Sequence, residues 1–116
     1  MVRIMIERQL KKRENIGKLL LELRREAMLH KGYINSELLF SSKSNSIILM
    51  MSNWQRLEDW RAFEKSEARK KINRRINPLL SKRPVVKAYE VLSSEELEYL
   101  EDPHAWTQKR EHSSLD

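Results

Sequence analysis

Cysteine is absent from this 116-residue chain, and glycine is scarce, with two residues. The missing thiols exclude disulfides and thiolate metal sites, and two isolated glycines exclude a glycine-rich phosphate-binding loop. No apolar run approaches the roughly 20 residues that a membrane span requires. Charges at Arg3, Glu7 and Arg8 interrupt the start of the chain, where a secretory signal would be apolar. We therefore expect a cytoplasmic protein with no membrane association.

Histidine is also rare, and its three copies, His30, His104 and His112, are scattered along the chain. No two His, Asp or Glu residues share ligand spacing on one face of an expected helix or strand, so we predict no metal site. No nucleophile–base pair can be recognised either. These absences argue against metal-dependent and nucleophilic catalysis.

Positive charge is abundant but unevenly placed within the net charge of +6. Residues 67–83 hold seven Lys and Arg against one Glu, whereas residues 94–102 hold five acidic residues and no basic one. A basic stretch can follow phosphates, but neither a recognition-helix pattern nor an aromatic stacking platform accompanies this one. We therefore predict a solvated helix face and no nucleic-acid partner.

Apolar periodicity divides the chain into strands, where apolar residues alternate, and helices, where they recur at spacing three or four. In chain order we expect a strand over 2–7, a helix over 14–30, strands over 33–41 and 47–51, a helix from Trp54 that pauses near Ser66, a further helix up to Pro78 and a strand over 85–92. A turn is expected at Asn53 and Trp54. Ser93 and Glu96 form a capping-box pattern that predicts a short further helix through Leu100.

The two glycines fall at different places in this pattern. Gly17 lies inside the first expected helix, where glycine costs about 1 kcal/mol relative to alanine, so we predict a close backbone approach there. Gly32 follows that helix, and we predict that it forms a left-handed cap.

The order β-α-β-β-α-α-β predicts an α+β fold, a ferredoxin-like split βαβ with a four-stranded antiparallel sheet and an extra C-terminal helix. Residues 1–92 are expected to form the domain, and residues 93–116 a helix and polar tail. The helices can cover one face of the sheet. The other face is too apolar to remain in water, so we expect a homodimer about a two-fold axis.

The dimer face is expected to combine polar and aromatic side chains. We assign five residues to it, Tyr33, Asn35, Glu37, Lys87 and Tyr89. Buried charges persist only when they are partnered, so we predict an ion pair between Glu37 and Lys87 or Arg3.

Several short stretches, in this order, resemble the antibiotic-biosynthesis monooxygenase (ABM) domain family. The matching stretches are GYINSELL at 32–39, SNW at 52–54, the W-x5-W-x2-F-x2-S series from Trp54 to Ser66, and VVKAYEV at 85–91. The resemblance covers about residues 1–92 and implies a dimeric α+β barrel with a pocket in each subunit, between the sheet and its helices. Some members of the family oxidise phenols or quinols with dioxygen and no cofactor, and others bind and degrade haem.

Carried onto this chain, the resemblance implies a site around the end of the third strand. Asn53 and Trp54 would be catalytic, as hydrogen-bond donors to a phenolate or enolate oxygen, and Trp60, Phe63 and Met51 would line the substrate. Other interpretations remain open. The aromatic residues can be core, Trp54 can plug the barrel, and Asn53 can be a turn or cap residue.

The chain departs from the haem-degrading relatives, which carry an asparagine on the first strand and a histidine on a covering helix. Here Glu7 or Arg8 lies at the first position, and Asn73 or a neighbour lies at the second. Our first hypothesis is therefore a cofactor-independent monooxygenase that oxidises an electron-rich aromatic of the phenol or quinol type. The alternative is a non-catalytic dimeric module that binds a small ligand or a protein partner, and haem binding or degradation is a third.

Overall fold

A computed structural model describes residues 1–101 and residue 104 of the chain. The main elements are β1 (Val2–Gln9), α1 (Ile16–Met28), β2 (Tyr33–Phe40), β3 (Ile47–Trp54), α2 (Leu57–Glu64), α3 (Glu67–Ile76) and β4 (Val85–Glu90), with short 3-10 helices η1 (Asn77–Leu79) and η2 (Glu96–Leu100). This order confirms the predicted α+β fold. None of the helices in the described ranges is long and apolar enough to cross a membrane.

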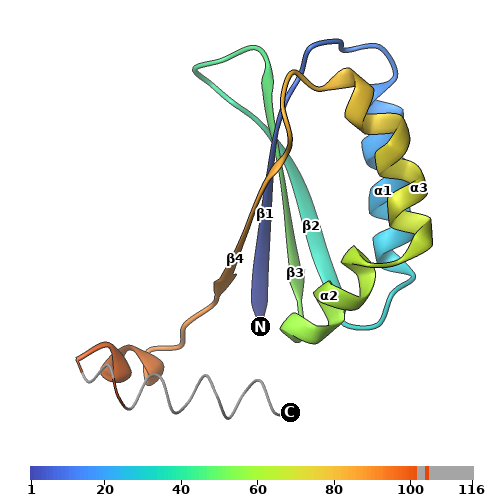
Figure 1. Ribbon diagram of the computed structural model, residues 1–116. Coiled ribbons are helices and arrows are strands. Elements are labelled where there is room, and N and C mark those ends of the chain that lie inside the picture. Colours follow the sequence, from blue (N-terminus) through green and yellow to red (C-terminus); the bar gives the residue numbers. More distant parts are fainter. Residues whose placement is uncertain (102–103, 105–116) are drawn as a thin grey trace.

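The four strands form one antiparallel sheet in the order β2-β3-β1-β4. The helices α1, α2 and α3 lie together on one face of this sheet (Figure 1). We call the opposite face the open face. The short helix η2 follows β4 at the end of the sheet away from α1 and α3 (Figure 1).

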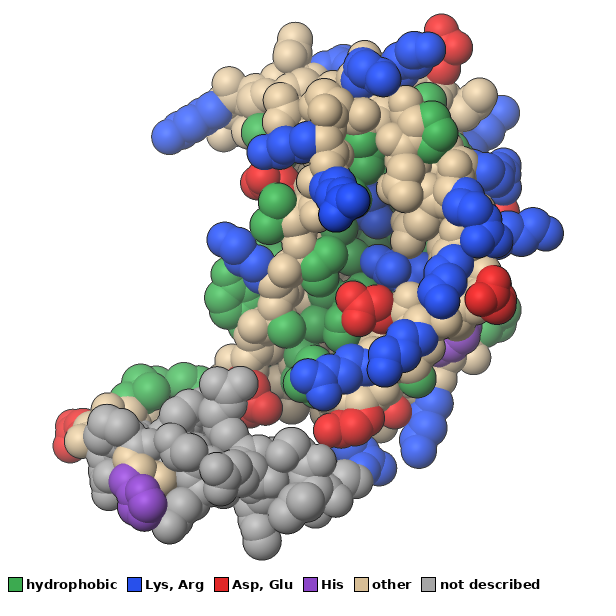
Figure 2. Space-filling view, in the orientation of Figure 1, with side chains coloured by type: hydrophobic (Ala, Val, Ile, Leu, Met, Phe, Trp, Pro, Cys, Tyr) green, Lys and Arg blue, Asp and Glu red, His purple; other side chains and the backbone are tan. Residues whose placement is uncertain are grey.

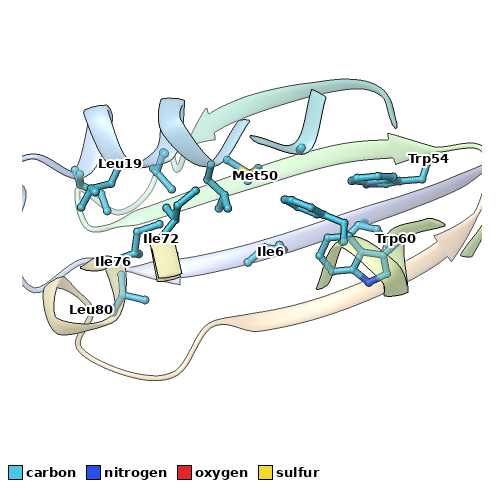
Figure 3. Packing of buried hydrophobic residues seen from close by; sticks show 14 of the residues in the cluster. Ile6, Leu19, Met50, Trp54, Trp60, Ile72, Ile76 and Leu80 are labelled. Atoms are coloured by element: carbon cyan, nitrogen blue, oxygen red, sulfur yellow. The ribbon is translucent and has the colours of Figure 1, made fainter. Parts of the chain in front are cut away.

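The core lies between the sheet and the three helices. Every second residue of β1 is buried, because Val2, Ile4 and Ile6 point toward the helices while their neighbours point to the open face. From the helices, Leu20 of α1 and Ile76 of α3 are both fully buried against this surface. Aliphatic side chains fill one end of the core, and the rings of Trp54 and Trp60 fill the other (Figure 3).

Two predicted caps are present in the structure. The Ser66 hydroxyl accepts a hydrogen bond from the Arg69 backbone N–H at 3.2 Å and begins α3. The Ser93 and Glu96 side chains each accept from the other residue's backbone N–H, at 3.2 and 3.3 Å, which confirms the capping box. The element that follows is a 3-10 helix instead of an α-helix. The predicted tail with His112 lies outside the described residues.

Strand β3 is longer than predicted and continues through Trp54. The expected turn at Asn53 and Trp54 is wrong, because these residues pair with Arg3 and Val2 of β1. The turn was predicted because two polar residues, Ser52 and Asn53, follow the apolar run 47–51. In the sheet, the Asn53 side chain finds partners on both neighbouring strands, so its polarity does not end the strand.

The two glycines have different structural roles. Gly32 has a φ of +88° and lies against α2, where an added Cβ would overlap the Asp59 carboxylate, so its predicted left-handed conformation is confirmed. It does not cap α1, because that helix ends at Met28 and has Leu29 as its C-cap. Its carbonyl also accepts from the Gln55 N–H at 2.8 Å, which ties the start of β2 to the end of β3. A Cβ added at Gly17 would have no atom within 4 Å, so the predicted close approach there is wrong.

Alanine substitutions at the two glycines should therefore have opposite effects. Gly32→Ala is expected to lower the free energy of unfolding by about 1–3 kcal/mol, through strain at positive φ and overlap with Asp59. Gly17→Ala, the control in the first turn of α1, should raise it by up to about 1 kcal/mol. Urea unfolding followed by circular dichroism measures both. Equal changes for the two variants would contradict the assignment.

Candidate functional site

A small cavity lies between the sheet and the helices at the end of the core where the aromatic residues gather. We call it the aromatic cavity. It is lined by Ile6, Met50, Ser52 and Trp54 from β1 and β3, Tyr33 and Ser36 from β2, Leu23, Arg24 and Ala27 from α1, and Trp60, Phe63 and Arg69 from α2 and α3. Its free volume is about 10 Å³, roughly the space that one water needs. The rings of the lining residues therefore nearly fill it.

Trp54 is the centre of the aromatic wall and is completely buried. Phe63 stacks on it with ring centroids 5.3 Å apart, and Trp60 and Tyr33 meet it edge-on at 5.9 and 5.6 Å. His30 meets the far side of this cluster, 4.8 Å from the Phe63 ring. Such ring pairs add about 0.5–1.5 kcal/mol each beyond their buried area, so the wall is well ordered.

The hydroxyl and indole groups that line the aromatic cavity form hydrogen bonds in two pairs. The indole N–H of Trp54 donates to the Ser52 hydroxyl at 3.0 Å in a fully buried contact. The Tyr33 and Ser36 hydroxyls lie 2.7 Å apart. Trp54 can therefore donate to a ligand only if that ligand replaces Ser52 as its acceptor.

The sequence-predicted site residues are divided between the two faces of the sheet. Trp54, Trp60 and Phe63 surround the aromatic cavity. Asn53 and Met51 point to the open face, because successive side chains in a strand alternate, and Met50 lines the cavity in place of Met51. The prediction that Asn53 and Trp54 act in one site is therefore wrong.

On the open face, the Asn53 side chain belongs to a short hydrogen-bonded row. Its carbonyl oxygen accepts from Arg3 Nε at 2.9 Å, and its amide nitrogen donates to Asn35 Oδ1 at 2.7 Å. This row crosses three strands, β1, β3 and β2. Asn53 is accordingly a structural residue of the sheet, and its amide is already engaged.

Two of the predicted dimer-face assignments need correction. Tyr33 lies on the helix-covered face, against Trp54, because a register shift between Tyr33 and Asn35 reverses the direction of its side chain. The predicted ion pair of Glu37 with Lys87 or Arg3 does not form within one chain. Glu37 and Lys87 lie at opposite edges of the sheet, about 14 Å apart at three strand spacings, and Arg3 binds Asn53.

The sequence prediction missed two arginines on the helix-covered side of the sheet, of which Arg8 is buried and Arg69 is partly buried. Arg8 is 1% exposed and continues the buried alternation of Val2, Ile4 and Ile6. Arg69, expected on a solvated face, instead lines the aromatic cavity. Its guanidinium carbon lies 5.2 Å from the centre of the Trp60 ring and 6.0 Å from that of Phe63, in cation–π geometry.

The two arginines interact electrostatically with each other. Burial and, as the smaller cause, repulsion from Arg69 together lower the pKa of Arg8 to about 10. Burial also lowers the pKa of Arg69, while attraction to Glu64 opposes that change. Both side chains remain cations at neutral pH. In the described part of the chain neither has a carboxylate within ion-pair distance, and the Nε of each is buried without a hydrogen-bond partner.

A second, open depression of about 520 Å³ lies at the other end of the helices. It is lined by Lys12, Glu14, Asn15, Lys18, Leu19, Arg75 and Leu79, which are mostly polar. Among residues 1–101 and 104, no three His, Asp or Glu side chains gather as metal ligands. The aromatic cavity, with its apolar walls and the partly buried cation Arg69 among them, is therefore the better candidate site.

The buried indole N–H of Trp54 has the Ser52 hydroxyl as its acceptor, so removal of this hydroxyl should destabilise the folded protein. Ser52→Ala leaves the buried indole N–H without an acceptor, so we expect the free energy of unfolding to fall by about 1–3 kcal/mol. Ser94→Ala, at an exposed position, is the control and should change it by less than about 0.5 kcal/mol. Urea unfolding followed by tryptophan fluorescence measures both. A wild-type stability for Ser52→Ala would contradict this role.

Comparison with known proteins gives structural matches only. No protein-family model and no curated protein sequence matches the chain. Among solved structures, the cofactor-independent oxygenase SnoaB from Streptomyces nogalater superposes with a TM-score of 0.73 at 7% identity, over 80% of this chain and 94% of that one. An antibiotic biosynthesis monooxygenase matches with a TM-score of 0.69 at 14% identity, over 80% of this chain and all of its own.

A conserved protein from Methanosarcina mazei Go1 also matches, with a TM-score of 0.69 at 19% identity over 78% of this chain and 92% of its own. At such identities the likeness establishes the fold and not the activity. The α+β fold with a four-stranded antiparallel sheet is therefore confirmed, and the dimeric barrel stays a prediction. The chain has the α+β fold that SnoaB and the antibiotic biosynthesis monooxygenases share.

Proposed function

We propose that the protein is a cofactor-independent monooxygenase that oxidises an electron-rich aromatic compound in the aromatic cavity. The observation that carries the proposal is the ring cluster around Trp54 with the cationic Arg69 beside it. Aromatic walls suit a flat aromatic substrate, and a cation in a water-poor site stabilises the anion from which such oxidations start. The shared fold with a cofactor-independent oxygenase adds support.

The reaction needs no electron source besides the substrate. A phenolate passes one electron to dioxygen, which gives a phenoxyl radical and superoxide. The two combine through a new C–O bond at the ring carbon opposite the phenolate oxygen. The resulting peroxide takes up one proton, and its O–O bond then breaks as hydroxide leaves the distal oxygen and the ring carbon loses its hydrogen as a proton; these two combine as one water and leave a quinone. One phenol and one dioxygen thus give one quinone and one water.

The substrate would enter from the side of β4, where the helices leave the sheet uncovered. Val86 and Ala88 point to the helix side of the sheet beside Ile6 and Ile4, yet both are exposed. Figure 2 shows a hollow on this side with hydrophobic side chains in its floor and Lys and Arg along its rim. Because the aromatic cavity holds about 10 Å³, binding requires side chains between this hollow and Trp54 to move.

The test is oxygen uptake with a panel of hydroxyanthrones and naphthols, each corrected for the rate in buffer. With ¹⁸O₂, the expected quinone carries one labelled oxygen atom per molecule. Ala27→Leu narrows the cavity, so we expect kcat/KM to fall by about tenfold or more. Asn53→Ala, on the open face, is the matched control and should retain kcat/KM within about threefold. Rates equal to buffer for every compound would favour the non-catalytic binding module.

We also propose that a second copy of the chain covers the open face. Leu39 and Tyr89 are 41% and 48% exposed on it, with Met5 and Met51 between them. The four residues of one row across this face are, in order, Glu37, Met51, Met5 and Lys87. A two-fold axis parallel to the strands would place Glu37 of one copy over Lys87 of the other. This charge arrangement favours such a dimer.

A charge exchange tests this arrangement. Glu37→Lys or Lys87→Glu alone places like charges opposite each other, so we expect the dimer dissociation constant to rise by about tenfold. The double exchange should restore dimerisation, since opposite charges then face each other again. Sedimentation equilibrium measures all four proteins. A wild-type chain that is monomeric at micromolar concentration would refute the dimer.

A further inference from the structure

Arg8, which is buried, and Arg69, which is partly buried, are two cations that repel each other. Arg69 lines the aromatic cavity, and Arg8 follows Ile6, another lining residue, on the same face of β1. A buried charge is costly unless it is paired, and two like charges near each other are costlier still. An apolar side chain of similar size at either position would avoid this cost. The chain instead keeps two cations, and in the described residues no carboxylate lies within ion-pair distance of either, although Glu64 attracts Arg69 from farther away.

We propose that Arg8 and Arg69 form an anion-binding subsite of the aromatic cavity, so that the preferred ligand is an aromatic compound carrying a carboxylate. The proposal rests on the proposed function for the location of the site, and it adds the chemical class of the substrate. Guanidinium groups bind carboxylates through two parallel N–H···O bonds, which gives this ligand its orientation as well as its affinity.

The surroundings of Arg69 support this role. Trp60 and Phe63 lie against its guanidinium, so the N–H groups at the edge of the group remain available while a face is stacked. Nη1 lies 3.5 Å from the Glu64 carbonyl oxygen, at the limit of a hydrogen bond, and Nε has no partner. The side chain is thus held mainly by ring contacts. An incoming carboxylate would replace weak contacts with strong ones.

Arg8 completes the subsite from the sheet. It lies in β1, one of the two inner strands of the sheet, and its 1% exposure gives it no access to bulk water. Glu7 and Gln9, its neighbours in β1, point to the opposite face and cannot neutralise it. A carboxylate between the two guanidinium groups would remove both the repulsion between them and the cost of their burial. Binding should therefore stabilise the folded protein.

The experiment compares a carboxylate with its neutral counterpart. Full-length protein is titrated by calorimetry with 1-hydroxy-2-naphthoate and with 1-hydroxy-2-naphthamide, which has nearly the same shape and no charge. We expect the naphthoate to bind at least about tenfold more tightly than the amide. Sodium acetate and sodium sulfate are added separately, because a site for any small anion would show equal competition by these ions.

Two variants assign the charge preference to the arginines. Arg69→Gln and Arg8→Met should each reduce naphthoate affinity by about tenfold or more and leave amide affinity within about threefold. Arg74→Gln, on the exposed side of α3, is the control and should change neither affinity. Arg8→Met should also raise the urea midpoint of the ligand-free protein, because it removes an unpaired buried charge. If Arg8 only stabilised the fold, Arg8→Met would lower that midpoint.

The outcomes separate this proposal from the oxygenase proposal, since the titrations involve no turnover. Tight naphthoate binding without oxygen uptake would support the subsite and refute the oxygenase. Oxygen uptake with equal affinity for naphthoate and amide would support the oxygenase and refute the subsite. Failure of both compounds to bind at millimolar concentration, or full competition by acetate, would overturn the subsite.

Discussion

The alternation of side chains along β1 determines the layout of the whole protein. β1 lies inside the sheet and pairs with β3 on one side and β4 on the other. Its register therefore decides which residues of both neighbours face the helices, and a shift by one residue would exchange the two faces. Val2 brings Trp54 into the core, whereas Arg3 holds Asn53 on the open face. The core, the aromatic cavity and the open face all follow from this one register.

Much of the fold could be predicted from the sequence because it depends on periodicity and short-range caps. The order of elements, the caps at Ser66 and Ser93 and the left-handed Gly32 are local properties. The extent of β3 is not local, since Asn53 stays in the strand only because Arg3 and Asn35, distant in sequence, bind its amide. The direction of the Tyr33 side chain likewise depends on a register shift that no pattern in the sequence predicts.

The buried arginines were missed for a different reason. Arg8 has the same alternation as Ile4 and Ile6, and Arg69 precedes Ile72 and Ile76 at helical spacing, so the signal was present. The sequence prediction did not place them on the core side despite this spacing, because arginine is rarely fully buried. A charged residue in phase with core residues is itself informative. It marks a place where the chain accepts a cost in stability, and such places are often functional.

The near-absence of free space around Trp54 has a kinetic consequence. If the ligand-free protein is closed, a ligand can enter only during excursions in which rings and the Arg69 side chain separate. The measured affinity is then the affinity of the open form multiplied by the fraction of molecules that are open. At high ligand concentration, the association rate would reach a plateau equal to the opening rate. The rate at which a few packed aromatic rings separate would thus set the maximum rate of ligand association.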